Sequence, residues 1–137
     1  MTAALLGGLL AGCAPSVQPV QTWEGSARVA LREQRYRLTF TVNDQTHDLR
    51  GQLQNLSSGD RFSVSGTWLP GPGGATVTAQ ISPGDSPTLR ASLLGFGLGE
   101  LPLKASALLT ATASGTNMVG DLRVNGIGYP VQFRRTD

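Results

Sequence analysis

The amino-acid sequence predicts an all-β domain: an antiparallel up-and-down meander of about nine strands that forms a barrel or half-barrel, with a β-sandwich as the alternative. Three observations predict it. From residue 22 onward, apolar and polar residues alternate with period 2, which is typical of strands with one buried face. The gaps between the alternating runs are turn-like and too short for the crossover helices that parallel strands need. Charged residues make up only 15% of the 137 residues, which excludes a coiled coil or a charged disordered tail.

The chain begins with a short apolar segment that ends at its single cysteine. Residues 1–12 carry no charged side chain. They are too few to span a bilayer, which takes about 20 apolar residues, but they match the apolar region of a secretory signal peptide. Leu10-Ala11-Gly12-Cys13 resembles the lipobox of bacterial lipoproteins. The resemblance implies cleavage before Cys13 and a diacylglyceryl group on its sulfur, so that the membrane is a partner.

This resemblance divides the chain into three parts. Residues 1–12 are the expected lipoprotein signal peptide, residues 13–21 the lipidated cysteine and an extended tether, and residues 22–137 a single all-β domain. The expected location is the cell envelope, and Ala14 resembles the residue after the cysteine in lipoproteins sent to the outer membrane of two-membrane bacteria. Signal peptides usually begin with Lys or Arg, whereas only the Met1 amine is positive here. The alternative is a chance apolar N-terminus with a lone buried cysteine.

Each expected strand has one apolar side and one polar side. The strands are expected at residues 22–32, 35–43, 48–54, 61–68, 75–82, 89–93, 103–113, 118–124 and 127–134. Turns are expected at residues 33–34, 43–44, 58–60, 70–74, 83–85, 114–115 and 125–126. Asn125-Gly126 is the strongest of these signals, because both residues accept the positive φ of a type I′ turn. Leu108 breaks the alternation, and the many alanines around it favour helix. Pro130 lacks an amide donor and predicts an edge or bulge with incomplete closure.

The apolar side of the strands combines aromatic and very small residues. Small inward residues permit strong curvature or leave space, so the aromatics either pack a core or line a cavity for a hydrophobic ligand. The candidate cavity residues are Trp23, Tyr36, Phe40, Phe62, Trp68, Tyr129 and Phe133.

Two other features suggest contacts with partners. Residues 93–103 are apolar without alternating, and they form either a plug over one barrel end or a lid or partner loop. The residues expected to carry that role are Leu94, Phe96, Leu98 and Leu101. Outward arginines gather in the first three strands, where they form a solvated face or contact acidic lipid or polysaccharide. These arginines are Arg28, Arg32, Arg35, Arg37 and Arg50.

The sequence contains few residues in contexts typical of catalysis. His47 is the only histidine, and its neighbours Asp44 and Asp48 are typical of a turn rather than a metal site. No serine has a nucleophile-elbow context. We therefore expect no enzyme activity, no catalytic residue, no metal and no cofactor. A net charge of +2 with scattered basic residues also argues against nucleic acid as a partner.

Three functions remain open. The first is a lipid-anchored envelope protein that binds a hydrophobic small molecule or acts as an envelope binding module. The second is a structural or assembly lipoprotein with a solid core, which contacts other envelope proteins through its outer face or through residues 93–103. The third is a small transmembrane barrel. It is less favoured, because several runs are shorter than the 9–11 residues that a membrane-spanning strand needs.

Overall fold

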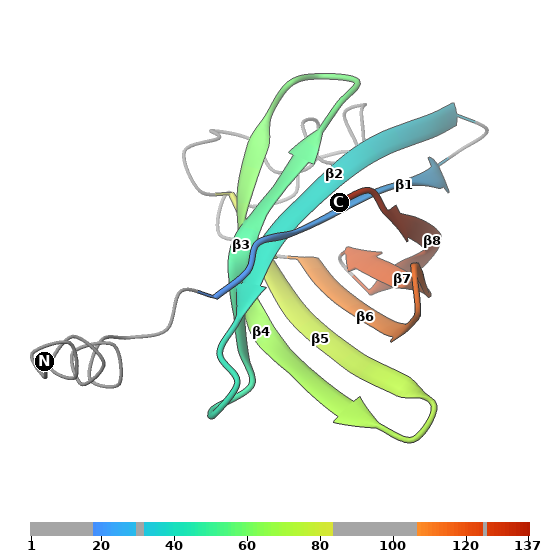
Figure 1. The fold of residues 1–137 in the computed structure, drawn as a ribbon. Coiled ribbons are helices and arrows are strands. Elements are labelled where there is room, and N and C mark those ends of the chain that lie inside the picture. Colours follow the sequence, from blue (N-terminus) through green and yellow to red (C-terminus); the bar gives the residue numbers. More distant parts are fainter. Residues whose placement is uncertain (1–17, 30–31, 84–106, 125) are drawn as a thin grey trace, which may run out of the picture.

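The computed structural model describes residues 18–29, 32–83, 107–124 and 126–137. These residues form a closed barrel of eight antiparallel strands, each paired with its neighbours in sequence order (Figure 1). The strands are β1 (Gln21–Val29), β2 (Arg32–Val42), β3 (Asp48–Asn55), β4 (Arg61–Gly71), β5 (Gly74–Ser82), β6 (Ala107–Ser114), β7 (Asn117–Val124) and β8 (Ile127–Arg135). The prediction of an all-β antiparallel meander is confirmed, and the barrel is closed rather than a half-barrel or sandwich.

Period-2 alternation decides which side of each strand faces the core. In β6, alanine or leucine at every second position is buried, and the residues between them are exposed. Leu108 falls on the outer side and is 38% exposed, so it breaks the hydrophobic pattern without breaking the strand. The alanine-rich segment forms a strand because pairing with β5 and β7 on both sides outweighs the helix propensity of alanine.

The expected ninth strand, at residues 89–93, lies outside the described residues, as do residues 103–106 of the following run. β5 pairs directly with β6, from Ala75 opposite Ala113 to Ile81 opposite Ala107. The barrel therefore closes with eight strands, and no strand lies between β5 and β6.

The hairpin turns lie near the expected positions, with one larger correction. The chain reverses at residues 72–73 and 115–116, within the expected 70–74 turn and next to the expected 114–115 turn, and residues 84–85 of the expected 83–85 turn lie outside the described residues. Val29 pairs with Arg32, which leaves residues 30–31 as the connection between β1 and β2. Glu33 and Gln34, expected to form that turn, instead belong to β2 and pair with β1. The expected turn at residues 125–126 is consistent with the pairing of Val124 with Ile127.

The barrel is closed by a short seam between the first and last strands. β1 and β8 share five residue pairs, from Trp23 opposite Arg135 to Ala27 opposite Val131. Every other neighbouring pair of strands shares at least seven. Pro130 lies one residue beyond the seam and still pairs with Asp121 of β7. It does stand at a local edge, as proline in a sheet requires, but the expected incomplete closure is wrong.

Inward glycines permit the tight curvature of the barrel. At Gly51 and Gly66, a Cβ atom would overlap the carbonyl oxygen of Thr39 and of Thr78 on the neighbouring strand. Gly51 stands opposite Phe40, whose Cα and Cβ atoms would lie within 3 Å of an added Cβ. Small inward residues were expected either to permit strong curvature or to leave space inside the barrel. Gly51 and Gly66 permit curvature.

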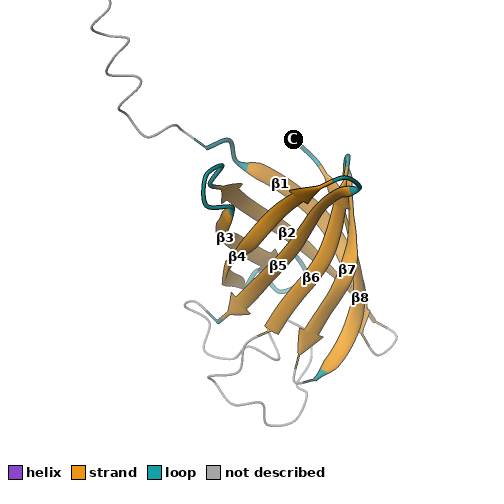
Figure 2. Cartoon of the chain, turned by 90° about the horizontal axis from the view of Figure 1, so that it is seen from below, coloured by secondary structure: helices purple, strands orange, loops and turns teal. Residues whose placement is uncertain are grey.

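The barrel has two distinct ends. We call the end that contains Gln21, residues 43–47 and the C-terminus the tether end, and the opposite end the far end (Figure 2). β5 ends at Ser82 and β6 begins at Ala107, both at the far end. The connection that contains residues 93–103 therefore leaves and rejoins the barrel at the end opposite the chain's first strand residue.

Candidate functional site

The structure brings all seven predicted cavity residues to one apolar cluster inside the barrel. Five of them are at most 3% exposed, and Trp68 and Tyr129 are partly buried against the same cluster. The Phe40 and Trp68 rings lie with their centroids 5.6 Å apart and their planes tilted by 41°. Phe40 and Trp68 therefore contact each other near the tether end of the core.

The extent of burial bears on whether these residues surround a ligand space. A side chain that lines a chamber large enough for a ligand remains accessible to a water-sized sphere inside it. Trp23, Phe40 and Phe62 are each only 1% exposed, and so is Leu38 between them. An eight-stranded barrel has an interior just wide enough for side chains to fill. The lining role of the seven residues stays a prediction, and their burial favours a filled interior.

Two buried amides at the far end were not anticipated from the sequence. Asn55 is fully buried, and its Nδ2 donates a hydrogen bond to Oε1 of Gln34 over 3.2 Å. The Asn55 Oδ1 accepts from the backbone N–H groups of Ser57 (2.8 Å) and Ser58 (3.2 Å). These bonds hold the β3–β4 turn over the barrel interior. Beside them, burial raises the pKa of the Tyr36 phenol far above its ordinary value.

The outer surface has one side that is rich in arginine and carries a net positive charge, although Glu24, Glu33 and Asp48 lie on it too. We call the outward arginines of β1–β4 the basic face; they are Arg28, Arg35, Arg37, Arg50 and Arg61. Arg32, at the start of β2, is exposed next to them. Both Nε and Nη2 of Arg37 lie 2.9 Å from Oε2 of Glu24. The predicted gathering of arginines on the first strands is therefore present, and Arg61 of β4 extends it.

The opposite side of the barrel carries no charge on its two central strands. We call the outward residues of β5 and β6 the uncharged face; they are Thr76, Thr78, Gln80, Ser82, Leu108, Thr110, Thr112 and Ser114. The barrel is thus electrostatically two-sided, because strands at opposite positions of a closed sheet face opposite directions.

The chain immediately before β1 lies beside the basic face. Val20 is 53% exposed and lines a shallow pocket of about 220 Å³ together with Thr41, Arg50 and Gln52. A second pocket, of about 210 Å³, lies between Glu24, Glu33 and Arg35 on the same side.

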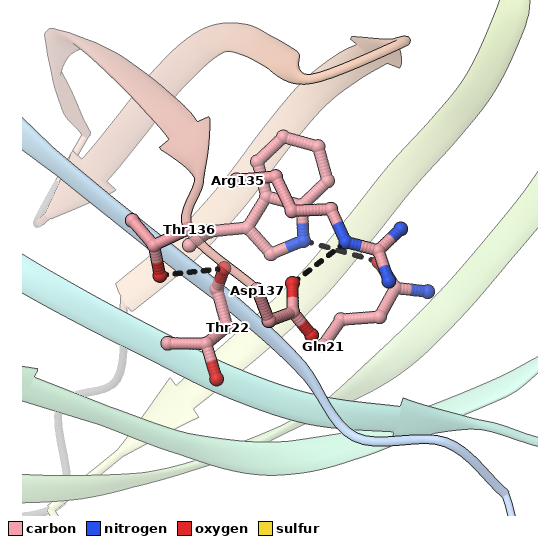
Figure 3. A network of polar contacts seen from close by, with 6 residues as sticks. Gln21, Thr22, Arg135, Thr136 and Asp137 are labelled. Atoms are coloured by element: carbon pink, nitrogen blue, oxygen red, sulfur yellow. Dashed lines mark hydrogen bonds and ion pairs between the residues drawn. The ribbon is translucent and has the colours of Figure 1, made fainter.

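The C-terminus is fastened to β1 at the tether end (Figure 3). The backbone N–H and the hydroxyl of Thr136 both donate to the Thr22 carbonyl oxygen, over 2.8 Å and 3.2 Å. Arg135 donates from Nε to Oδ1 of Asp137 over 2.8 Å, and this hydrogen bond lowers the pKa of the Asp137 carboxyl. The last residues therefore extend the short β1–β8 seam.

The only histidine lies in the turn between β2 and β3. His47 has a φ of 65°, and its backbone N–H donates to the Asn43 carbonyl oxygen over 2.7 Å. The Asn43 side chain accepts from the backbone N–H groups of Gln45 and Thr46, so its amide serves the turn. In the part of the chain that the structure describes, no group of three or more His, Cys, Asp or Glu residues is placed to hold a metal ion.

Other predicted site residues lie outside the described residues. They are Cys13, Leu94, Phe96, Leu98 and Leu101. Over the described ranges, no helix has the length and apolar character needed to cross a membrane.

The described strands do not have the surface that a barrel in lipid requires. A transmembrane barrel carries an apolar band on its outside and polar residues within. Here the apolar residues face inward, and the outward positions of β2 and β5 are mainly Arg, Thr and Gln. The transmembrane arrangement considered from the sequence is therefore wrong for these strands.

Comparison with protein-family models gives no match, and comparison with curated proteins gives none either. Among solved structures, the chain is similar to the isotype 1 transferrin binding protein B (TbpB) from serogroup B Neisseria meningitidis, with a TM-score of 0.44 and 16% sequence identity. The match covers 85% of this chain and 25% of that chain. The chain thus spans about a quarter of that protein, and a likeness at this level bears on neither ligand nor activity.

Proposed function

We propose that this protein is a lipid-anchored, non-enzymatic lipoprotein of the cell envelope whose barrel is a solid scaffold that binds partners through its outer surface. The lipobox-like Leu10-Ala11-Gly12-Cys13 supports the anchor. The observation that carries the mode of binding is the near-complete burial of the inward aromatic side chains. A filled interior leaves the outside of the barrel as the surface available for recognition.

The outer surface suits such a role. On β2 and β5 the outward side chains are mainly arginine, threonine and glutamine, which offer charged and neutral hydrogen-bond donors. The closed sheet leaves the strands little unpaired edge on which to add another chain, so recognition falls to side chains rather than to the backbone. The shortest part of the sheet, the β1–β8 seam, is covered at the tether end by Thr136.

A hydrophobic carrier is the second candidate, and the seven inward-facing aromatics favour it. Native mass spectrometry of the chain from Ala14 to Asp137, purified from a bacterial host without refolding, separates the two. If the barrel is a solid scaffold, the spectrum should show only the mass of the bare chain. An adduct of lipid mass that is lost on denaturation would replace the scaffold by the carrier, because only an enclosed apolar space retains a lipid through purification.

The anchor has its own test. The full chain is expressed in a bacterium fed an alkyne-bearing palmitate analogue, and incorporation is compared with that of Cys13→Ser and of the neighbouring control Ser16→Ala. We expect the native chain and Ser16→Ala to be labelled and to sediment with membranes, with the outer membrane where the cell has two. Labelling of Cys13→Ser, or no labelling of the native chain, contradicts the anchor.

A further inference from the structure

Two features of the molecule bear on how the barrel lies relative to the membrane: the basic face and the position of the chain before β1. We infer that the basic face docks on the phosphate groups of an anionic phospholipid surface, the membrane in which the chain is anchored. The inference rests on the proposed lipid anchor and adds to it the orientation of the barrel.

The register of the strands concentrates positive charge on this side. Arg134 of β8 and Arg37 of β2 flank Glu24 of β1 in one row across the sheet. The same row continues through Gln54 to Arg61 of β4. One carboxylate thus stands among three guanidinium groups, which leaves the row with a net positive charge.

The neighbouring rows are mixed: Glu33 pairs with Arg28, and Asp48 stands opposite Thr67 without a basic partner in its row. The five outward arginines of β1–β4 still outnumber the three outward carboxylates, which leaves this face with a net charge of +2. Arg35 stands opposite Ser26, and Arg50 stands between Thr41 and Ser65. These arginines are spaced by hydroxyl groups, which can also donate hydrogen bonds to phosphate oxygens. On the uncharged face, by contrast, the described residues of β5 and β6 offer no charge to a membrane.

The tether brings the basic face to the membrane rather than away from it. Val20 lines one pocket together with Arg50 and Gln52, so the described chain before β1 lies beside this face. Seven residue steps separate Val20 from Cys13, a reach of at most about 25 Å. A barrel held this closely by an anchor at Cys13 needs only a small rotation to place the basic face on the lipid surface.

The chemistry of the face fits phosphate. Guanidinium groups bind phosphate oxygens through paired N–H donors, and each arginine near an anionic membrane strengthens binding about fivefold. The attraction acts over about a Debye length, roughly 10 Å at moderate salt, so it favours docking once the tether has brought the barrel close. A membrane is favoured over an acidic polysaccharide because the tether path supplies the proximity.

The experiment uses the chain from Ala14 to Asp137, which contains every strand of the closed barrel but lacks the anchor cysteine. Binding is measured by co-sedimentation with vesicles of phosphatidylcholine and phosphatidylglycerol, and with vesicles of phosphatidylcholine alone. We expect binding only to the vesicles that contain phosphatidylglycerol, and its loss at high salt. Arg35→Gln/Arg50→Gln is expected to weaken that binding about 25-fold, because each arginine contributes a factor of about five.

The matched control is Arg123→Gln/Thr76→Glu, which changes the net charge by the same amount through β7 and the uncharged face. It should bind nearly as well as the native chain. If both variants lose vesicle binding equally, the binding depends on net charge alone and the docking of this particular face is wrong. If the native chain does not bind the vesicles, the docking is wrong as well. Binding to a soluble acidic polysaccharide without vesicle binding would assign the face to polysaccharide and overturn it too. Because Cys13 is absent from this chain, failure of the anchor is detected separately by the palmitate labelling.

Discussion

Single residues set the curvature of this barrel, and Gly66 is the sharpest case. A methyl group there would overlap the Thr78 carbonyl oxygen and the Ala79 Cα, which are both backbone atoms and cannot rotate away. We expect Gly66→Ala to lower the free energy of unfolding by about 2–3 kcal/mol. Gly73→Ala is the control, because its Cβ would meet nothing within 4 Å and should leave stability nearly unchanged. Urea denaturation measures both, and equal effects would contradict the role given to Gly66.

The buried phenol of Tyr36 predicts a loss of stability in alkali. Its pKa is raised above the ordinary 10.0 by desolvation. Above pH 10 the unfolded chain therefore releases a proton that the folded chain keeps, and the free energy of unfolding falls as pH rises. The Tyr36 contribution should fall by about 1 kcal/mol between pH 10 and pH 11.

Tyr36→Phe supplies the comparison, because it keeps the ring and removes the ionisable group. Its unfolding free energy, measured by denaturant titration at both pH values, should fall by about 1 kcal/mol less than that of the native chain. Identical pH dependence of the two proteins would show that Tyr36 does not resist ionisation in the fold.

The side of the sheet that a residue occupies follows largely from its parity in the strand, and parity can be read from the sequence. Tyr36, Leu38 and Phe40 were expected on one side and are buried together. Gln34 continues the same parity, but its polarity and the adjacent Glu33 indicated a turn instead. Its burial depends on Asn55, 21 residues away, whose amide bonds to it, and no local pattern reveals such a partner.

Among the elements, the β1–β8 seam has the fewest pairs and gains two bonds from the last residues. Deleting Thr136 and Asp137 removes both hydrogen bonds to the Thr22 carbonyl oxygen. We expect the free energy of unfolding to fall by about 1–2 kcal/mol. Amide hydrogen exchange in β1, measured by mass spectrometry, should become faster. Arg135→Gln breaks only the exposed ion pair and should change little, because water and salt screen such pairs. Unchanged exchange in β1 after the deletion would show that the seam does not need its C-terminal extension.

Strand positions were more predictable than strand number or closure. Alternation located all eight strands and gave the bounds of β3, β5, β7 and β8 to within one residue, and turn residues such as Gly126 marked their ends. The first hairpin was misplaced because Arg32 and Glu33 are polar in succession, and only the pairing of Val29 with Arg32 fixes where the chain reverses. Closure was underestimated because Pro130 lies beyond the last β1–β8 pair, where its missing N–H removes no bond from the seam.

At the scale of the whole molecule, the candidate site needs the closed barrel. The sequence showed arginines on consecutive strands, but it did not show that the far side of the barrel would be uncharged. That contrast arises because closure places β1 and β2 opposite β5 and β6. Nor did the sequence show which face the chain before β1 lies beside, because only the fold brings Val20 and Arg50 to one pocket.

The topology also predicts the order of folding. All strand pairs but one join neighbours along the chain, whereas the seam joins residues as far apart as Thr22 and Thr136, 114 positions from each other. Closing so long a loop is entropically costly, so the seam should form after the folding transition state. Val131 in the seam and Val77 in β5 are both buried valines, and each mutation to alanine should cost about 2 kcal/mol. Stopped-flow kinetics should show Val131→Ala mainly speeding unfolding and Val77→Ala mainly slowing folding. If Val131→Ala slows folding as much as Val77→Ala does, the barrel closes before its hairpins are complete.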